Sequence, residues 1–208
     1  MSPNSSLDDT MAVRRGGRPS RRTEIVVAAM EAFAATGYHN TSLNDIADQL
    51  DMTAAGILHH FKTKENLLVE VLEFRDGLGP NPSNPSGRAF FDSLVAVAAR
   101  NEVKPGLTQL YTVLAAESLT HDHPAQDWFR DRYDRVRSVV REALIDEVGE
   151  GWGSIADEVD AGAQAIVAAM DGLQVQFLLE PEKYPMVASL EMTINCITAH
   201  LRARAAEA

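Results

Sequence analysis

The sequence is poor in cysteine and in aromatic side chains, and it has no long apolar run. Cys196 is the one cysteine among 208 residues, which excludes an internal disulfide and a thiolate metal cluster. An uncharged stretch such as Ala161–Met170 is too short to cross a bilayer, and residues 1–13 lack a cleavable signal pattern. We therefore expect a soluble protein of the reducing cytoplasm, with no membrane partner.

Basic side chains are also scarce, and their distribution is uneven. The 19 Lys and Arg residues stand against 30 Asp and Glu, and the net charge of −11 argues against unfocused adhesion to nucleic acid or to an anionic membrane. Near the start, however, five arginines crowd into nine positions: Arg14, Arg15, Arg18, Arg21 and Arg22. They indicate either a solvated tail or a flexible cationic arm over residues 1–19 that meets a polyanion locally.

Catalytic and metal-binding motifs are missing as well. No Ser/His/Asp order, glycine-rich phosphate loop, His-Glu-x-x-His or paired-carboxylate motif stands out, so we expect neither an enzyme nor a cofactor. His121 and His123 have the residue type of metal ligands. Their i, i+2 spacing in a proline turn is nevertheless more typical of a solvated turn, and no metal site is expected.

Helical periodicity runs through the chain, and no alternating β-branched pattern predicts a strand. Gly37 ends the first predicted helix, Ser42 with Asp45 forms a variant capping box, and Thr53 can cap the third helix. Three glycines and three prolines between residues 77 and 87 predict a domain boundary. The predicted helices, about nine in all, span residues 20–36, 43–50, 54–60, 63–75, 88–102, 106–119, 124–147, 157–179 and 186–205.

Two short predicted helices, residues 43–50 and 54–60, are joined by a tight turn and preceded by a longer helix. This order is typical of a helix-turn-helix, whose second helix lies in the major groove of DNA. Spacing alone leaves open a helical hairpin that does not bind DNA.

Three runs in this region resemble the N-terminal domain of the TetR family of transcriptional regulators: GYHNTSLNDIA (37–47), TAAGILHHF (53–61) and KTKENLL (62–68). The resemblance covers roughly residues 20–72, and Met170-Asp171-Gly172-Leu173 is similar to a segment common in the family. It implies an all-α homodimer, most often a repressor of a palindromic operator that a small-molecule effector releases. The helix-turn-helix DNA-binding domain would span residues 20–76, and a helical effector-binding and dimerisation domain residues 88–208.

The resemblance also implies which residues meet DNA. Lys64 matches the phosphate-binding lysine, and Asn44 stands where some members contact a base, although a solvated helix position is the alternative. His59 and His60 lie at the end of the recognition helix. They either contact DNA or are capped histidines at a helix end. The full set expected at DNA is Arg18, Arg21, Arg22, Ser42, Asn44, Thr53, Ala54, Ala55, His59, His60 and Lys64.

Three positions depart from the family pattern. Asp51 replaces a glycine of the turn, which an Asp tolerates in a left-handed conformation. Leu58 replaces a tyrosine, and Gly56 weakens the recognition helix. We therefore expect phosphate contacts and DNA shape to supply much of the affinity.

In the second domain, a ligand-responsive regulator needs a cavity. The expected lining is Tyr111, Glu117, His121, Trp128, Phe129, Tyr133, Met170 and Phe177, although periodic apolar residues are more often plain core. Ile194 and Ile197 are expected at a dimer interface made by the last two helices. The alternatives are a helical small-molecule-binding or interaction protein without DNA binding, and a DNA-binding regulator without an effector.

Overall fold

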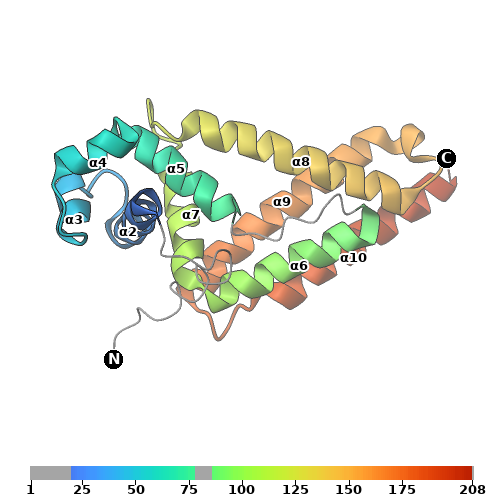
Figure 1. Ribbon diagram of the computed structural model, residues 1–208. Helices are drawn as coiled ribbons and strands as arrows, with labels where there is room; N and C mark the ends of the chain where they lie inside the picture. Colours follow the sequence, from blue (N-terminus) through green and yellow to red (C-terminus); the bar gives the residue numbers. More distant parts are fainter. Residues whose placement is uncertain (1–19, 78–85, 208) are drawn as a thin grey trace. The chain divides into compact units, whose positions relative to one another are not determined.

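The computed structural model describes residues 20–77 and 86–207, and this part of the chain is helical without a strand (Figure 1). It holds nine α-helices and one short 3-10 helix, which confirms the all-α fold class predicted from the sequence. The predicted arm, with Arg18, lies outside the described residues, as does most of the predicted break between 77 and 87. No helix in the described ranges is long and apolar enough to cross a membrane.

The described chain forms two compact units, and the first ends at Val71 inside a helix. Its buried side chains include Phe33, Ile46 and Ile57, which come from three different helices and are each fully inaccessible to solvent. Burying these apolar surfaces together supplies the main driving force for this small unit. Its helices are α2 (Arg21–Thr36), α3 (Leu43–Asp48), α4 (Ala54–Phe61) and the first part of α5 (Lys64–Gly77).

Local signals set the ends of these helices. The Ser20 hydroxyl accepts a hydrogen bond from the Thr23 amide at 3.2 Å and so caps α2. Gly37, with φ of 80°, ends α2 and donates its amide to the Phe33 carbonyl at 2.9 Å. The Thr63 hydroxyl accepts from the Asn66 amide at 3.1 Å at the start of α5. The Gly37 stop predicted from the sequence is therefore in place.

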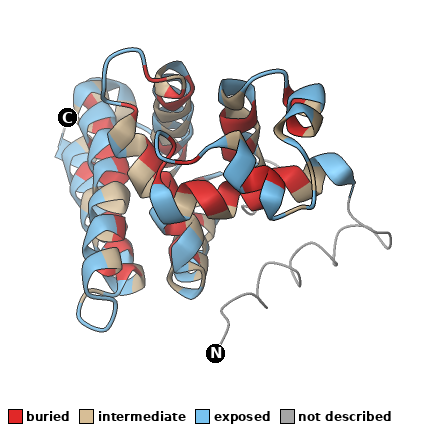
Figure 2. Ribbon diagram, turned by 90° about the vertical axis from the view of Figure 1, so that its left-hand side faces the viewer, coloured by how far each residue is buried: buried red, intermediate tan, exposed pale blue. Residues whose placement is uncertain are grey.

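The second unit begins at Leu72 and is a helical bundle. Its helices after α5 are α6 (Gly87–Val103), α7 (Pro105–Glu117), α8 (Gln126–Val148), η1 (Trp152–Ile155), α9 (Ala156–Leu179) and α10 (Met186–Glu207). α9 packs against α7, α8 and α10, and α6 lies along α10 (Figure 1). The buried positions, red in Figure 2, follow the inward stripes of these helices.

The contact between α9 and α10 is close. A Cβ atom added at Gly162 would come within 3.0 Å of Ile197 Cγ2 and 3.3 Å of Leu201 Cδ1, so the glycine lets the two helices approach. Ile194 is 1% exposed and Ile197 packs against the same core. The expectation that Ile194 lies at a dimer interface is therefore wrong, because this side chain faces the interior of the subunit. Ile197 is only partly buried, and its place at an interface stays a prediction.

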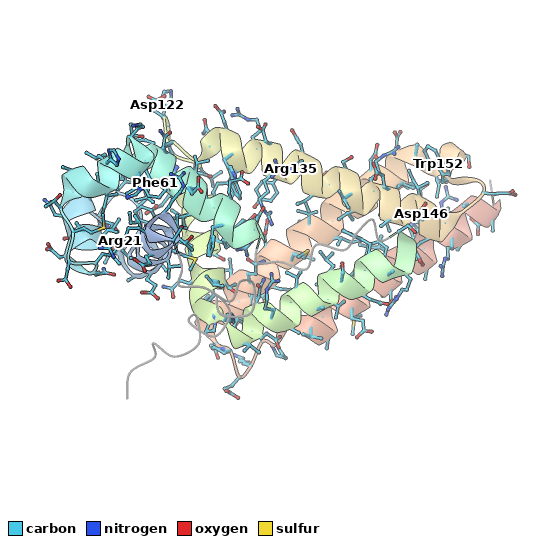
Figure 3. All side chains as sticks on the ribbon, viewed as in Figure 1. Arg21, Phe61, Asp122, Arg135, Asp146 and Trp152 are labelled. Carbon is cyan, nitrogen blue, oxygen red and sulfur yellow. The ribbon has the colours of Figure 1, made fainter. Side chains whose placement is uncertain are left out.

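Several helix bounds differ from the predictions by one or two residues. α3 ends at Asp48 rather than 50, because the Leu50 and Met52 amides both turn back to the Ala47 carbonyl at 3.0 Å. α8 begins at Gln126 rather than 124, after His123 Nδ1 accepts the Ala125 amide at 3.2 Å. In the second half of α8, Arg141 lies 5.3 Å from the ring centre of Trp152, which Figure 3 labels.

Candidate functional site

The turn between α3 and α4 is held by its own side chains. Ser42 and Asp45 form a reciprocal capping box, with the Ser42 amide donating to Asp45 Oδ2 at 2.7 Å and the Asp45 amide donating to Ser42 Oγ at 3.1 Å. The hydrogen bonds from Ser42 lower the pKa of Asp45 below its ordinary value. Asp51 has φ of 52°, the left-handed conformation expected for it, and the Thr53 hydroxyl caps α4 by accepting from the Gly56 amide at 3.1 Å.

One face of α4 is packed inward and the other is exposed. Ile57 and Phe61 are buried against the unit's core. Ala55, Leu58 and His59 are exposed, at the i, i+3 and i+4 positions that lie together on one helix face. The exposed face of α4 therefore offers two apolar side chains and one imidazole to a partner.

Lys64 stands at the first residue of α5. Its Nζ donates to the Tyr38 carbonyl at 2.6 Å and lies 4.2 Å from the centre of the Tyr38 ring. Tyr38 in turn donates its hydroxyl to Glu65 Oε1 at 3.2 Å, and burial, followed by the Glu65 charge, raises the pKa of that hydroxyl. The ammonium group is thus oriented beside the N-terminus of α5, where backbone amides favour an anion.

The two described arginines of the expected DNA set contact the helix-turn-helix itself. Arg21 donates to the Leu50 carbonyl at 2.6 Å and to Glu24 at 2.8 Å. Arg22 donates to the His60 carbonyl at 2.7 Å and to Glu70 at 2.8 Å, with its guanidinium 4.3 Å from the centre of the Phe61 ring. Arg21 thus engages a carbonyl just after α3, and Arg22 one at the end of α4. Figure 3 labels Arg21 and Phe61 in this unit.

The remaining predicted DNA residues lie on the same two short helices. Asn44 is exposed on the first turn of α3, while Ala54 and His60 are partly buried on α4. His59 and His60 lie edge to face, with ring centres 5.7 Å apart. The structure thus gathers Ser42, Asn44, Thr53 and the residues of α4 within one small unit, and their contact with DNA stays a prediction.

The second unit contains a cavity of about 430 Å³ between α7, α8 and α9. Three of the eight predicted ligand residues line it: Tyr111, Phe129 and Tyr133. The ring centres of Tyr111 and Phe129 are 5.3 Å apart, and those of Phe129 and Tyr133 are 6.5 Å apart. An aromatic wall of this kind suits a ligand with an apolar body.

The α9 wall of the cavity is polar, and sequence reasoning did not assign it. Asp171 and Gln174 lie three residues apart on one helix face, and both line the cavity. The Tyr133 hydroxyl donates to Asp171 Oδ2 at 2.6 Å. Burial raises the pKa of Asp171, and burial together with the Asp171 hydrogen bond raises that of Tyr133. Asp171 is the one charged residue between 161 and 179, which is the signal that could have identified it.

Tyr111 connects the cavity to a buried charge cluster at the end of α5. Arg75 and Arg132 lie over the Tyr111 ring at 4.3 and 4.6 Å from its centre, and Arg132 Nη1 donates to the Tyr111 hydroxyl at 2.8 Å. Asp76 pairs with both arginines, at 3.1 Å from Arg75 and 2.9 Å from Arg132. Burial lowers the pKa of Arg75. Neither guanidinium lines the cavity.

The other five predicted ligand residues do not line this cavity. Trp128 and Phe177 are buried, and Trp128 donates its indole N–H to Glu73 at 2.7 Å. Met170 instead borders a separate small void, which Gln174 also lines. Glu117, the last residue of α7, is partly buried, and its carboxylate lies 4.0 Å from His123 Nε2. His121 is exposed. Sequence reasoning placed them near the cavity because it could not tell which faces of α7, α8 and α9 meet.

The histidine turn separates its two imidazoles. His121 is exposed and pairs with Asp122 at 2.7 Å, whereas the His123 side chain is fully buried. Asp122 has φ of 60° and projects from the turn (Figure 3). Among residues 20–77 and 86–207, no group of three or more His, Cys, Asp or Glu side chains is arranged to hold a metal ion.

Two protein families match the chain. The family of bacterial regulatory proteins, tetR family, matches residues 25–71, which hold most of the helix-turn-helix unit. The family described as BetI-type transcriptional repressor, C-terminal, matches residues 88–202 and so covers more than half of the chain.

Individual proteins agree with these families. The HTH-type transcriptional repressor KstR2 of Rhodococcus jostii (strain RHA1) is 38% identical over 72 residues, which are 34% of this chain and 33% of that protein. The match thus spans only about a third of that relative's length. The HTH-type transcriptional regulator BetI of Rhizobium meliloti (strain 1021) is 24% identical over 190 residues, 90% of this chain and 93% of that one.

Solved structures share the fold. The crystal structure of a transcriptional regulator from Rhodococcus sp. Rha1 superposes with a TM-score of 0.68 at 18% identity, covering 88% of this chain and 96% of that one. The capped helix-turn-helix, the helical bundle that follows it in the chain and the two family matches lead to one assignment: the chain belongs to the TetR family of transcriptional regulators.

Proposed function

We propose that this chain is a homodimeric transcriptional repressor that binds a palindromic operator and is released by a small-molecule effector bound between α7, α8 and α9. The observation that carries the proposal is the exposed face of α4. Ala55, Leu58 and His59 face outward from a recognition helix whose opposite side is locked into the core. In a helix-turn-helix, this is the face that enters the major groove.

Phosphate contacts would position that helix. Lys64 and the N-terminal amides of α5 supply a cation and backbone donors at one place. Ser42 and Thr53 add hydroxyls at the two short helix starts. Because Ala54 and Ala55 offer only methyl groups to bases, we expect phosphate contacts and DNA shape to carry much of the affinity.

The exposed faces of α9 and α10 support the dimer. On α9, the exposed residues at spacings of three and four are small or apolar: Ala161, Ala165, Ala168, Gly172, Val175 and Leu179. On α10 the corresponding residues are Ala188, Met192, Cys196, Ala199 and Ala203. Two such faces can pair with their copies across a twofold axis into a four-helix bundle. This seam replaces Ile194 in the proposed interface.

The cavity supports an effector site. It has an aromatic wall and a polar wall, the combination that small-molecule sites present. Tyr111 belongs to the cavity and also contacts Arg75 on α5, the helix that runs on from the DNA-binding unit. An effector would release DNA only through a difference in its affinity for the DNA-bound and unbound states.

A footprinting experiment tests the proposal. Purified protein is incubated with the DNA upstream of its own and adjoining transcription units, and protection is mapped at low and moderate ionic strength. We expect a protected inverted repeat, with a half-site spacing near one or two helical turns of DNA. If no DNA is protected even at low ionic strength, the alternative becomes the better description: a helical small-molecule-binding or interaction protein that does not bind DNA.

A further inference from the structure

We propose that the cavity selects a lipophilic amine, whose protonated nitrogen pairs with Asp171 while its apolar body lies against Tyr111, Phe129 and Tyr133. The inference rests on the proposed function, in that it names the chemical class of the effector. It commits to a cation rather than to a neutral or acidic molecule.

The surroundings of Asp171 favour a cationic ligand. This carboxylate lines the cavity and accepts one hydrogen bond from the neutral Tyr133 hydroxyl at 2.6 Å. Within residues 20–77 and 86–207 it forms no ion pair. The charges of Arg132 and Arg75 act on this partly buried carboxylate, but no cation pairs with it directly in the described chain, and burial raises its pKa. A ligand that brings a cation into direct contact would offset the cost of burying the charge.

The nearby arginines are already held elsewhere. Arg75 and Arg132 both pair with Asp76 and do not line the cavity. Arg130 does line it, but its guanidinium donates to Asp127 at 2.7 Å and its side chain is 63% exposed. The first two guanidiniums share one carboxylate, Asp76, and their charges also act on Asp171, but neither forms an ion pair with Asp171 among the described residues or lines the cavity. A ligand inside the cavity therefore meets the Asp171 carboxylate directly.

The Gln174 amide oxygen favours a ligand that donates hydrogen bonds, and the Thr112 hydroxyl can accept one. Gln174 is 5% exposed, and its Oε1 accepts no hydrogen bond from the described chain. Thr112 Oγ1, on the α7 wall, is also buried without a partner. An ammonium group has three donors and no acceptor, so it satisfies Asp171 and has donors left for an amide or hydroxyl oxygen.

The aromatic wall favours the same class. Three rings line the cavity that holds Asp171, and the negative faces of aromatic rings attract a nearby cation. Acidic ligands would bring a second negative charge beside Asp171. Neutral ligands would leave the carboxylate unpaired.

Three molecules with one indole body and different end groups provide the test: tryptamine is a cation, tryptophol is neutral and indolepropionic acid is an anion. Each is titrated into the purified full chain by isothermal calorimetry, without DNA. We expect tryptamine to bind about tenfold more tightly than tryptophol, as a charged hydrogen bond predicts, and the acid to bind most weakly.

Two variants locate the preference. Asp171→Asn keeps the size of the side chain and an acceptor for Tyr133, and it should bring the affinities of tryptamine and tryptophol to within about twofold of each other, because the charge is gone. Asp131→Asn removes the same charge from an exposed position of α8 outside the cavity and should keep the full preference. Circular dichroism confirms that both variants are folded.

Three results would overturn the proposal: tryptophol or the acid binding as tightly as tryptamine, an unchanged preference in Asp171→Asn, or no binding of any of the three at millimolar concentration. The titration contains no DNA, so its failure can be distinguished from a failure of the footprinting experiment, which tests DNA binding. If tryptamine binds but the footprint shows no protected operator, the cavity would still be an amine site, and the proposed role as a repressor would be wrong.

Discussion

Arg22 on α2 donates from Nη1 to the carbonyl oxygen of His60 at 2.7 Å, and so ties the last turn of the recognition helix to the first helix of the unit. The two residues are 38 positions apart in the chain. The same guanidinium pairs with Glu70 and lies over Phe61. Arg22 therefore has a structural role in this unit, whatever it adds at DNA.

Arg22→Met tests that role. The variant keeps an apolar stem but loses both hydrogen bonds, so we expect a lower free energy of unfolding, by about 1 kcal/mol. DNA binding should weaken while the slope of log K against log salt stays unchanged. Glu70→Gln, which removes the ion pair but leaves the carbonyl contact, should cost less. A salt slope reduced by about one in Arg22→Met would instead identify a phosphate contact.

Lys64→Ala should weaken binding to operator and to random DNA by similar factors, because a phosphate contact carries no sequence information. The slope of the salt dependence should fall by about one. Gel-shift titrations at several salt concentrations measure both effects.

The matched control for Lys64 is Lys62→Asn. Lys62 is exposed two residues earlier, and a residue with a Cβ atom already adopts its unusual backbone conformation, with φ of 69° and ψ of −49°, so Asn adds no new clash there. Lys62→Asn removes the same charge as Lys64→Ala, but outside the N-terminus of α5. It should therefore weaken DNA binding less. A loss in Lys64→Ala that is confined to the operator would contradict the phosphate role.

Met192→Glu should dissociate the proposed dimer without unfolding the subunit. Met192 is 67% exposed on α10, so a carboxylate there is tolerated in the monomer but not in an apolar interface. Sedimentation measures the mass, and circular dichroism checks the fold. Val103→Glu, on another strongly exposed apolar residue at the end of α6, serves as the control and should remain dimeric. A dimeric Met192→Glu would exclude this seam.

Ile194→Glu should behave differently from Met192→Glu. Because Ile194 is buried inside the subunit, the charge would be placed in the core and the variant should lose its cooperative thermal transition. A folded but monomeric Ile194→Glu would restore the interface first expected from the sequence.

Asp171→Asn should make the ligand-free protein more stable at neutral pH. Burial raises the folded-state pKa of Asp171 above its unfolded value, so ionisation destabilises the folded state as pH rises between the two values. Below both pKa values the residue is protonated in either state, and the cost is absent. The melting temperature of the variant should exceed that of the parent at neutral pH, and the gap should close on acidification. A gap that widens in acid would contradict a raised pKa.

The predicted helices and caps succeeded where the signals are local. Ser42 and Asp45 are three residues apart, as are Thr53 and Gly56, so the sequence alone contains both partners of each cap. The left-handed Asp51 likewise follows from the short turn that the spacing requires. The apolar periodicity predicted every α-helix of the described chain, with bounds that shifted by a residue or two.

What the sequence determined by itself is therefore the order of helices, their caps and the family, because these depend on neighbouring residues and on motif spacing. Only the tertiary structure decided the partners of Arg22, the inward direction of Ile194 and the meeting of Asp171 with Tyr133. Each of these depends on contacts between helices that are far apart in the chain. Helical periodicity shows that a face is apolar or polar, but only packing selects the helix that it meets.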